Sequence, residues 1–152
     1  MAETRVTDPV EMILKNKGRA IWSVAPDTLV YDAIGMMSDK NIGACLVVWQ
    51  DKLVGIISER DYARKVLLKG KSSKTTQVQE IMSSPVTTVT PHHTVDECMR
   101  IITNARIRHL PVVDGERIIG VISIGDLVNW IISVQQETIH YLESYITGRY
   151  PG

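Results

Sequence analysis

The sequence predicts a mixed fold of helices and strands, α/β in the α+β sense, made of two tandem β-α-β-β-α repeats. The first observation behind this prediction is an internal repeat, because Pro26 and the residues after it match Pro91 and its successors at a constant shift of 65 residues. The second is that apolar residues recur with the same periods in both copies. The first-copy residues that meet an identical residue are Val24, Pro26, Val30, Ile42, Val47, Val48, Gly55, Ile57, Ser58 and Asp61.

Each copy opens with an extended segment, at 22–25 and at 86–90, which runs up to the matched proline. A helix follows, near Thr28 in the first copy and near His93-Thr94 in the second. Its apolar residues have helical spacing: Val30, Ile34 and Met37, then Val95, Met99 and Ile102.

Two strands come next in each copy, and a second helix closes the unit. The strands are expected at 44–49 and 54–57, joined by a turn at 50–52, and at 110–113 and 118–122, joined by Asp114-Gly115. Asp-Gly between apolar runs is a strong hairpin signal. The closing helices should begin at Ser58 and Ser123.

The remaining segments complete a predicted organisation of five parts. These are an N-terminal helical segment (1–20, with a helix at 9–17), repeat 1 (21–68), a polar linker (69–83), repeat 2 (84–133), and a C-terminal helix extension and tail (134–152). The final helix, expected from Asp126 to Ile146, carries Leu127, Trp130, Ile131, Val134, Ile139, Leu142 and Tyr145 along roughly one side. We expect a homodimer to cover this stripe, the alternative being that the helix folds back over the chain's own sheet or its N-terminal helix.

Composition excludes several classes of partner. The chain has 152 residues, with 17 Lys+Arg against 17 Asp+Glu, so it lacks the basic surplus of a nucleic-acid-binding protein. No run of about 18 apolar residues occurs, and the first residues lack the apolar core of a signal peptide, so we expect no membrane partner and a cytoplasmic location. Cys45 and Cys98 lie in apolar runs, which predicts reduced, buried thiols, and we expect no metal site.

The residues that suggest chemistry are the two Ser-x-x-Asp segments, Ser58 to Asp61 and Ser123 to Asp126, each directly after a buried strand. One interpretation is purely structural, because this spacing is nearly a capping box that satisfies the first N–H groups of a helix. The other is a ligand site, because a carboxylate can accept two hydrogen bonds from a ribose diol and a helix N-terminus favours phosphate.

Two residues favour the ligand interpretation. Gly125 stands in the first turn of a helix, where glycine costs about 1 kcal/mol relative to alanine, and capping does not require it. Arg60 places a cation at the positive end of a helix, which is unfavourable for the helix and favourable beside a phosphate.

With these segments the chain resembles the CBS-domain family, whose repeats end in Gly-h-h-Ser/Thr-x-x-Asp (h, apolar). The resemblance covers residues 21–68 and 84–133, and the protein is similar to the stand-alone tandem CBS-domain pairs, also called Bateman modules. It implies that the repeats pack with pseudo-twofold symmetry and leave two clefts. In the family these clefts commonly hold an adenosine ligand: AMP, ADP, ATP, S-adenosylmethionine or NAD.

The resemblance also implies ligand-binding residues. Asp61 and Asp126 would hold ribose hydroxyls in separate clefts, with Ser58 and Ser123 near the ribose or phosphate. Each cleft would borrow from the other repeat: Ile107, Arg108 and His109 for the Asp61 cleft, with Arg60, and Ile42, Gly43 and Ala44 for the Asp126 cleft, with Gly125. Pro26 and Pro91 would form cleft walls.

The expected function is therefore a regulatory sensor module that binds an adenosine nucleotide and signals its presence to a partner protein. No catalytic cofactor and no catalysis are expected, because neither serine has a His base and orienting acid evident in the sequence, and no GxxxxGK[ST] loop occurs. The alternative function is a structural dimerisation or partner-regulating module without a ligand.

Overall fold

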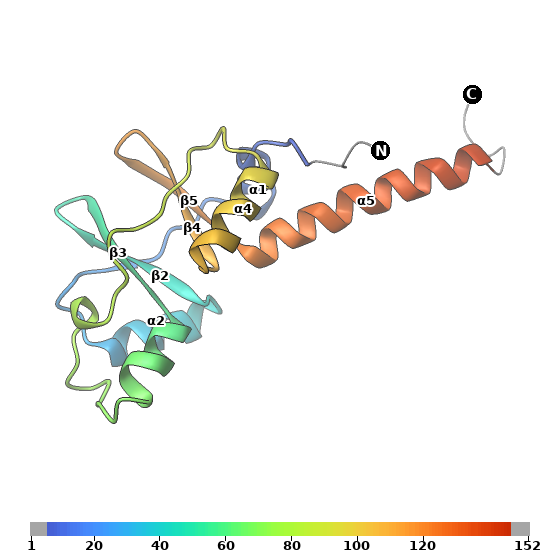
Figure 1. Cartoon of the computed structure of the whole chain (residues 1–152). Coiled ribbons are helices and arrows are strands. Elements are labelled where there is room, and N and C mark those ends of the chain that lie inside the picture. Colours follow the sequence, from blue (N-terminus) through green and yellow to red (C-terminus); the bar gives the residue numbers. More distant parts are fainter. Residues whose placement is uncertain (1–5, 147–152) are drawn as a thin grey trace. The chain divides into compact units, whose positions relative to one another are not determined.

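The computed structural model describes residues 6–146 (Figure 1). The outermost residues of the predicted N-terminal segment and C-terminal tail, 1–5 and 147–152, lie outside this range. The elements are α1 (Val10–Lys17), β1 (Ser23–Val24), α2 (Val30–Lys40), β2 (Ala44–Trp49), β3 (Lys52–Ser58), α3 (Glu59–Tyr62), the π-helix η1 (Ala63–Leu67), the 3-10 helix η2 (Val78–Glu80), α4 (Val95–Ala105), β4 (His109–Asp114), β5 (Arg117–Ser123) and α5 (Ile124–Ile146). The predicted order of strand, helix, strand, strand and helix is confirmed in the first copy, and the last four of these elements are confirmed in the second copy.

One predicted extended segment is reduced in the second copy. Residues 22–25 contain β1, which pairs in parallel with β2, whereas in 86–90 a single parallel bridge joins Val89 to Val112. Pro85, which has no N–H to donate, precedes this segment at the position where the first copy has Ala20.

The described residues form two compact units. The first unit comprises residues 6–19, 89–112 and 121–146, and the second unit comprises 20–88 and 113–120. One sheet has the strand order β1-β2-β3 and the other pairs β4 with β5.

In the second unit, α2 packs on the three-stranded sheet around a core that includes the linker. Its buried residues are Val30, Ala33, Met37, Cys45, Val47, Ile57, Val66, Val78 and Ile81. The N-cap residue Leu29 gives α2 no side-chain cap, and the linker supplies acceptors in its place. The N–H groups of Val30 and Tyr31 donate to the carbonyls of Thr76 and Ser73, at 2.8 and 3.0 Å. The polar linker therefore stabilises the start of α2.

In the first unit, α1 is fixed against α4 and α5. Val10, Ile13 and Leu14 of α1 are buried, and the Val10 N–H donates to the carbonyl of His93 at 2.8 Å. The Nε1–H of Trp130 on α5 donates to the Asp8 carboxylate at 2.9 Å. The N-terminal segment thus covers the part of the predicted α5 stripe that includes Trp130.

The two cysteines are buried and free, as predicted. Burial raises the pKa of both thiols to about 12, and the Glu97 carboxylate adds to this effect at Cys98. Because the thiolate is the reactive form, we expect Ellman's reagent at pH 8 to label the native protein very slowly and to label 2 thiols per chain in guanidinium. Fast labelling of the native protein would contradict this burial.

Candidate functional site

The first Ser-x-x-Asp segment lies where β3 ends and α3 begins. The Ser58 Oγ accepts a hydrogen bond from the Asp61 N–H at 3.1 Å, and the Asp61 Oδ2 accepts one from the Ser58 N–H at 3.0 Å. The Ser58 hydroxyl also donates to the same Oδ2 at 3.0 Å. These reciprocal bonds form a capping box, as the spacing of this motif indicates.

The second carboxylate oxygen of Asp61 faces other groups. Its Oδ1 lies 3.1 Å from the Lys65 ammonium, one turn along the chain, and 3.5 Å from the Ser83 hydroxyl. The Asp61 side chain is 14% exposed. One oxygen of Asp61 therefore belongs to the helix cap, and the other faces a cation and a hydroxyl.

Ser83 faces Asp61, although no motif in the sequence indicates this residue. It reaches Asp61 because Ser83 and Ile56 form an antiparallel bridge, in which each N–H donates to the other residue's carbonyl, at 2.9 and 3.1 Å. Next to this bridge, a Cβ on Gly55 would lie 2.4 Å from the Met82 sulfur. The glycine of the Gly-h-h-Ser motif thus leaves room for the linker beside β3.

The second Ser-x-x-Asp segment has the same cap and a different cation. The Asp126 N–H donates to the Ser123 Oγ at 3.1 Å, and the Ser123 N–H donates to the Asp126 Oδ2 at 2.8 Å. The Lys17 ammonium, at the end of α1, donates to the same Oδ2 at 2.7 Å. Burial raises the pKa of Asp126, but the bonds from Lys17 and Ser123 outweigh it and lower the pKa.

Two other predicted site residues contact the helix start of their own repeat. The Glu59 N–H donates to the Gly43 carbonyl at 3.0 Å, and the Ile124 N–H donates to the Arg108 carbonyl at 2.8 Å. His109 is half-buried, and its pKa is lowered by burial, by Lys17 and by Arg108, against the opposing effect of Asp126. The assignment of these residues to the other repeat's aspartate stays a prediction.

The remaining predicted residues differ in burial. Pro91 is buried, whereas Pro26, Ile42, Ala44, Arg60 and Ile107 are half-buried. Gly125 is exposed, and a Cβ added there would meet the Ser123 Oγ at 3.6 Å, an ordinary contact. The packing of the described chain therefore does not require glycine at position 125.

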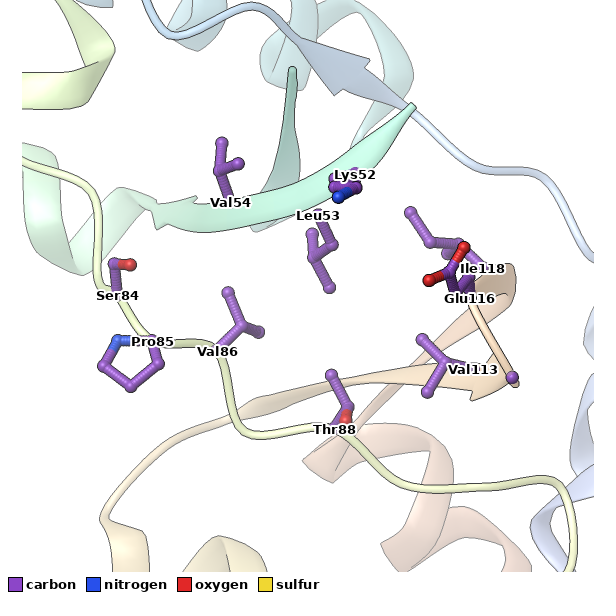
Figure 2. A pocket seen from close by; sticks show the side chains of 11 residues that line it. Lys52, Leu53, Val54, Ser84, Pro85, Val86, Thr88, Val113, Glu116 and Ile118 are labelled. Atoms are coloured by element: carbon purple, nitrogen blue, oxygen red, sulfur yellow. The ribbon is translucent and has the colours of Figure 1, made fainter. Parts of the chain in front are cut away.

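The second unit contains a pocket of about 550 Å³ beside the end of the linker (Figure 2). The side chains of Leu53, Val86 and Val113 point toward its interior, with the charged residues Lys52 and Glu116 beside them. The full lining is Lys52, Leu53, Val54, Ser84, Pro85, Val86, Thr88, Val113, Gly115, Glu116 and Ile118. An apolar lining with a few polar groups is typical of small-molecule sites.

Residues 6–146 contain neither a cluster of metal-binding side chains nor a membrane-spanning helix. No group of three or more His, Cys, Asp or Glu side chains in this part of the chain is arranged to hold a metal ion. None of its helices combines the length and the apolar character that crossing a membrane requires.

Known proteins resemble this chain over most of its length. It is 41% identical over 148 residues to the mitochondrial CBS domain-containing protein CBSX3 of Arabidopsis thaliana, across 91% of this chain and 71% of the relative. The structure of a candidate signal-transduction protein with CBS domains from Burkholderia ambifaria is 52% identical, with a TM-score of 0.80, covering 83% of this chain and 95% of that one.

A more distant structure carries bound ligands. The CBS domain pair of protein MJ0100, in complex with 5-methylthioadenosine and S-adenosyl-L-methionine, is 26% identical, with a TM-score of 0.75, covering 84% of this chain and 98% of that one. The profile of the CBS domain matches residues 7–68 and 78–133 of this chain. The chain therefore belongs to the CBS-domain family and contains a tandem pair of CBS domains.

Proposed function

We propose that the protein is a regulatory sensor that binds adenosine nucleotides at its two Ser-x-x-Asp sites and signals their presence to a partner protein. The observation that carries this proposal is the carboxylate pair Asp61 and Asp126, each partly exposed at the start of a helix that follows a buried strand. The proposed ligands are AMP, ADP, ATP, NAD and S-adenosylmethionine. The similar MJ0100 domain pair, which holds two adenosine compounds, supports this class.

The geometry of the two sites suits a ribose next to a phosphate. Capping engages Asp61 through Oδ2, while Oδ1 faces Ser83 and Lys65, so a ribose hydroxyl can bond to a carboxylate held in place by the cap. At Asp126, the positive end of the dipole of the 23-residue helix α5 favours an anion. Gly125, which the chain's own packing does not require, leaves room for close approach of a ligand.

The other residues implied by the family resemblance stay part of this proposal. They are Arg60, Ile107, Arg108 and His109 for the ligand at Asp61, Ile42, Gly43 and Ala44 for the ligand at Asp126, and Pro26 and Pro91 as walls. The cytoplasmic location expected from the sequence also stays a prediction, and the name of the Arabidopsis relative gives that protein a mitochondrial location.

A regulatory role is favoured over catalysis by how the serines are used. The Ser58 hydroxyl bonds to Asp61, and the Ser123 hydroxyl accepts from the Asp126 N–H. A nucleophilic serine instead shares its hydroxyl with a general base that removes the proton. The two serine hydroxyls therefore act in helix capping, and this use favours ligand binding over nucleophilic catalysis.

Ligand binding is tested by thermal unfolding and calorimetric titration with AMP, ATP, NAD and S-adenosylmethionine. At about 100 times Kd, each occupied site should stabilise the fold by about 2.7 kcal/mol, which raises the unfolding midpoint by several degrees. Asp61→Asn and Asp126→Asn should each abolish one site, because an amide oxygen still caps the helix but the amide nitrogen cannot accept a ribose hydroxyl.

The matched control is Glu97→Gln in the capping box of α4. Glu97 accepts from the N–H and hydroxyl of Thr94 at 3.1 and 3.0 Å, so this variant alters the same kind of cap where no ligand is proposed. It should bind like the parent. If none of the four compounds shifts the unfolding midpoint at millimolar concentration, the ligand-binding proposal is contradicted and the alternative of a structural module without a ligand is favoured.

We also propose that α5 joins two copies in a homodimer. Its exposed apolar residues are Ile124, Val128, Ile132, Ile139 and Leu142, spaced by three, four or seven residues, which places them along one side of the helix. A twofold axis lets such a stripe cover itself.

A further inference from the structure

The cation on Asp126 comes from a segment distant in sequence. Lys17 ends α1, and its ammonium donates to the Asp126 Oδ2 at 2.7 Å and to the Val121 carbonyl at 2.9 Å. Buried Ile13 and Leu14 anchor α1 in the first unit, so the position of Lys17 is set by packing and not by the ion pair alone. The N-terminal helix therefore supplies a group at the proposed second ligand site.

The first site is built differently. The cation there is Lys65, four residues after Asp61, and it belongs to the same helical segment as the carboxylate. The Lys65 ammonium also donates to the Ile81 carbonyl at 2.9 Å. Of the two motif carboxylates, Asp126 pairs with a cation from outside its repeat, whereas Asp61 pairs with one from its own repeat. A change in α1 should therefore act on the Asp126 site and leave the Asp61 site intact.

We propose that Lys17 is a specificity-determining residue of the Asp126 site, where it selects ligands that carry a phosphate over uncharged nucleosides. The proposal rests on the proposed function, since it assumes that a ribose binds Asp126. The Asp126 Oδ2 already accepts hydrogen bonds from the Lys17 ammonium and the Ser123 N–H. A ribose hydroxyl that bonds to this oxygen must therefore share it with Lys17 or displace Lys17. Competition with Lys17 thus weakens every ribose ligand at this site.

A phosphate offsets this competition. The Lys17 side chain is 41% exposed, so its ammonium can turn away from the carboxylate, and a ligand phosphate offers it a new anionic partner. His109 lies close enough to interact electrostatically with Lys17 and Asp126, and its pKa is lowered by burial, by Lys17 and by Arg108 against the opposing effect of Asp126. An uncharged nucleoside offers no such partner, so it breaks one ion pair without forming another.

The test compares AMP with adenosine, which differ by the phosphate alone, in calorimetric titrations of an Asp61→Asn background. Lys17→Met should bind adenosine more tightly and AMP more weakly than the background, so that the ratio of AMP to adenosine affinity falls about tenfold or more. Lys17→Arg keeps the cation and should largely retain the ratio. The control Lys15→Met removes an exposed lysine from the same helix and should leave both affinities unchanged.

The outcomes separate this inference from the function on which it rests. If the background protein binds AMP or adenosine and Lys17→Met changes both affinities by the same factor, the role of Lys17 is refuted and the ligand site stands. If the background protein binds neither compound, the adenosine site at Asp126 is refuted together with the role of Lys17. Circular dichroism and the unfolding midpoint establish that each variant is folded at the titration temperature.

Discussion

Replacing Gly55 by valine should lower the free energy of unfolding by about 3 kcal/mol, the upper part of the usual range for overpacking a core. Even a Cβ at this buried position would lie 2.4 Å from the sulfur and 2.9 Å from the Cγ of Met82. The Sδ and Cγ of Met82 can rotate away, but its Cβ, 3.2 Å from the added Cβ, is held by the backbone, because two backbone hydrogen bonds join the adjacent Ser83 to Ile56. The midpoint of thermal unfolding should fall by about 10 °C for a chain of this size.

A double variant and a glycine control identify the cause. Gly55→Val combined with Met82→Ala should recover part of the lost stability, since the shortened side chain gives the new methyl groups space. Gly35→Ala, in α2, adds a Cβ that meets nothing within 4 Å and should raise stability by up to about 1 kcal/mol. A Gly55→Val protein as stable as the parent would refute the steric role of this glycine.

Gly55→Val should also weaken ligand binding at Asp61 and leave ligand binding at Asp126 unchanged. Met82 leads directly into Ser83, whose hydroxyl lies 3.5 Å from the Asp61 carboxylate. Moving Met82 therefore moves a group that faces the proposed ribose position. This link gives a physical reason for glycine in the Gly-h-h-Ser motif of the first repeat, beyond its fit in a strand.

Elements defined by short-range patterns were predictable from the sequence. The β2 strand has the predicted limits 44–49, because its apolar run ends at a turn in which Gln50 and Asp51 have positive φ. Both Ser-x-x-Asp segments form the capping geometry that their spacing indicates. In these cases the residues that interact lie within four positions of one another.

Features that depend on distant residues were not predictable in this way. Lys17 and Asp126 are 109 positions apart, and nothing local marks a lysine at a helix end as a partner for that carboxylate. Ser83 lies in a stretch assigned as linker because it is polar, yet the segment before it contributes Val78 and Ile81 to the core. Single apolar residues in a polar segment give too short a pattern to indicate burial.

The predicted α5 stripe shows how tertiary contacts divide a helix face. Trp130 was expected on a surface that a second chain covers, but it is half-buried and bonds to Asp8. At about 100° per residue, Leu127, Trp130 and Val134 lie on one side of α5, and Val128, Ile132 and Ile139 lie on a side about 150° further around the helix. Both sides are apolar, so the sequence pattern alone does not tell which of them α1 and α4 cover.

The homodimer should dissociate when this exposed stripe is made acidic. Ile132 and Ile139 are 45% and 55% exposed, and burying two such side chains at an interface contributes several kcal/mol. Ile132→Glu combined with Ile139→Glu should therefore raise the dimer Kd at least 100-fold, equivalent to about 2.7 kcal/mol. Sedimentation at micromolar concentration should report twice 17.0 kDa for the parent and 17.0 kDa for this variant.

The position of the substitution, and not the added charge, should decide the result. Ser133→Glu adds a carboxylate away from the exposed stripe, because one residue turns an α-helix by about 100° and Ser133 follows Ile132 directly. This control should remain dimeric. A parent mass of 17.0 kDa would refute the dimer, and a double variant that stays dimeric would place the interface elsewhere. Trp130 donates a hydrogen bond within its own chain and lies off the exposed stripe. Replacing it should therefore weaken the packing of α1 against α5 and lower the stability of the fold more than it raises the dimer Kd.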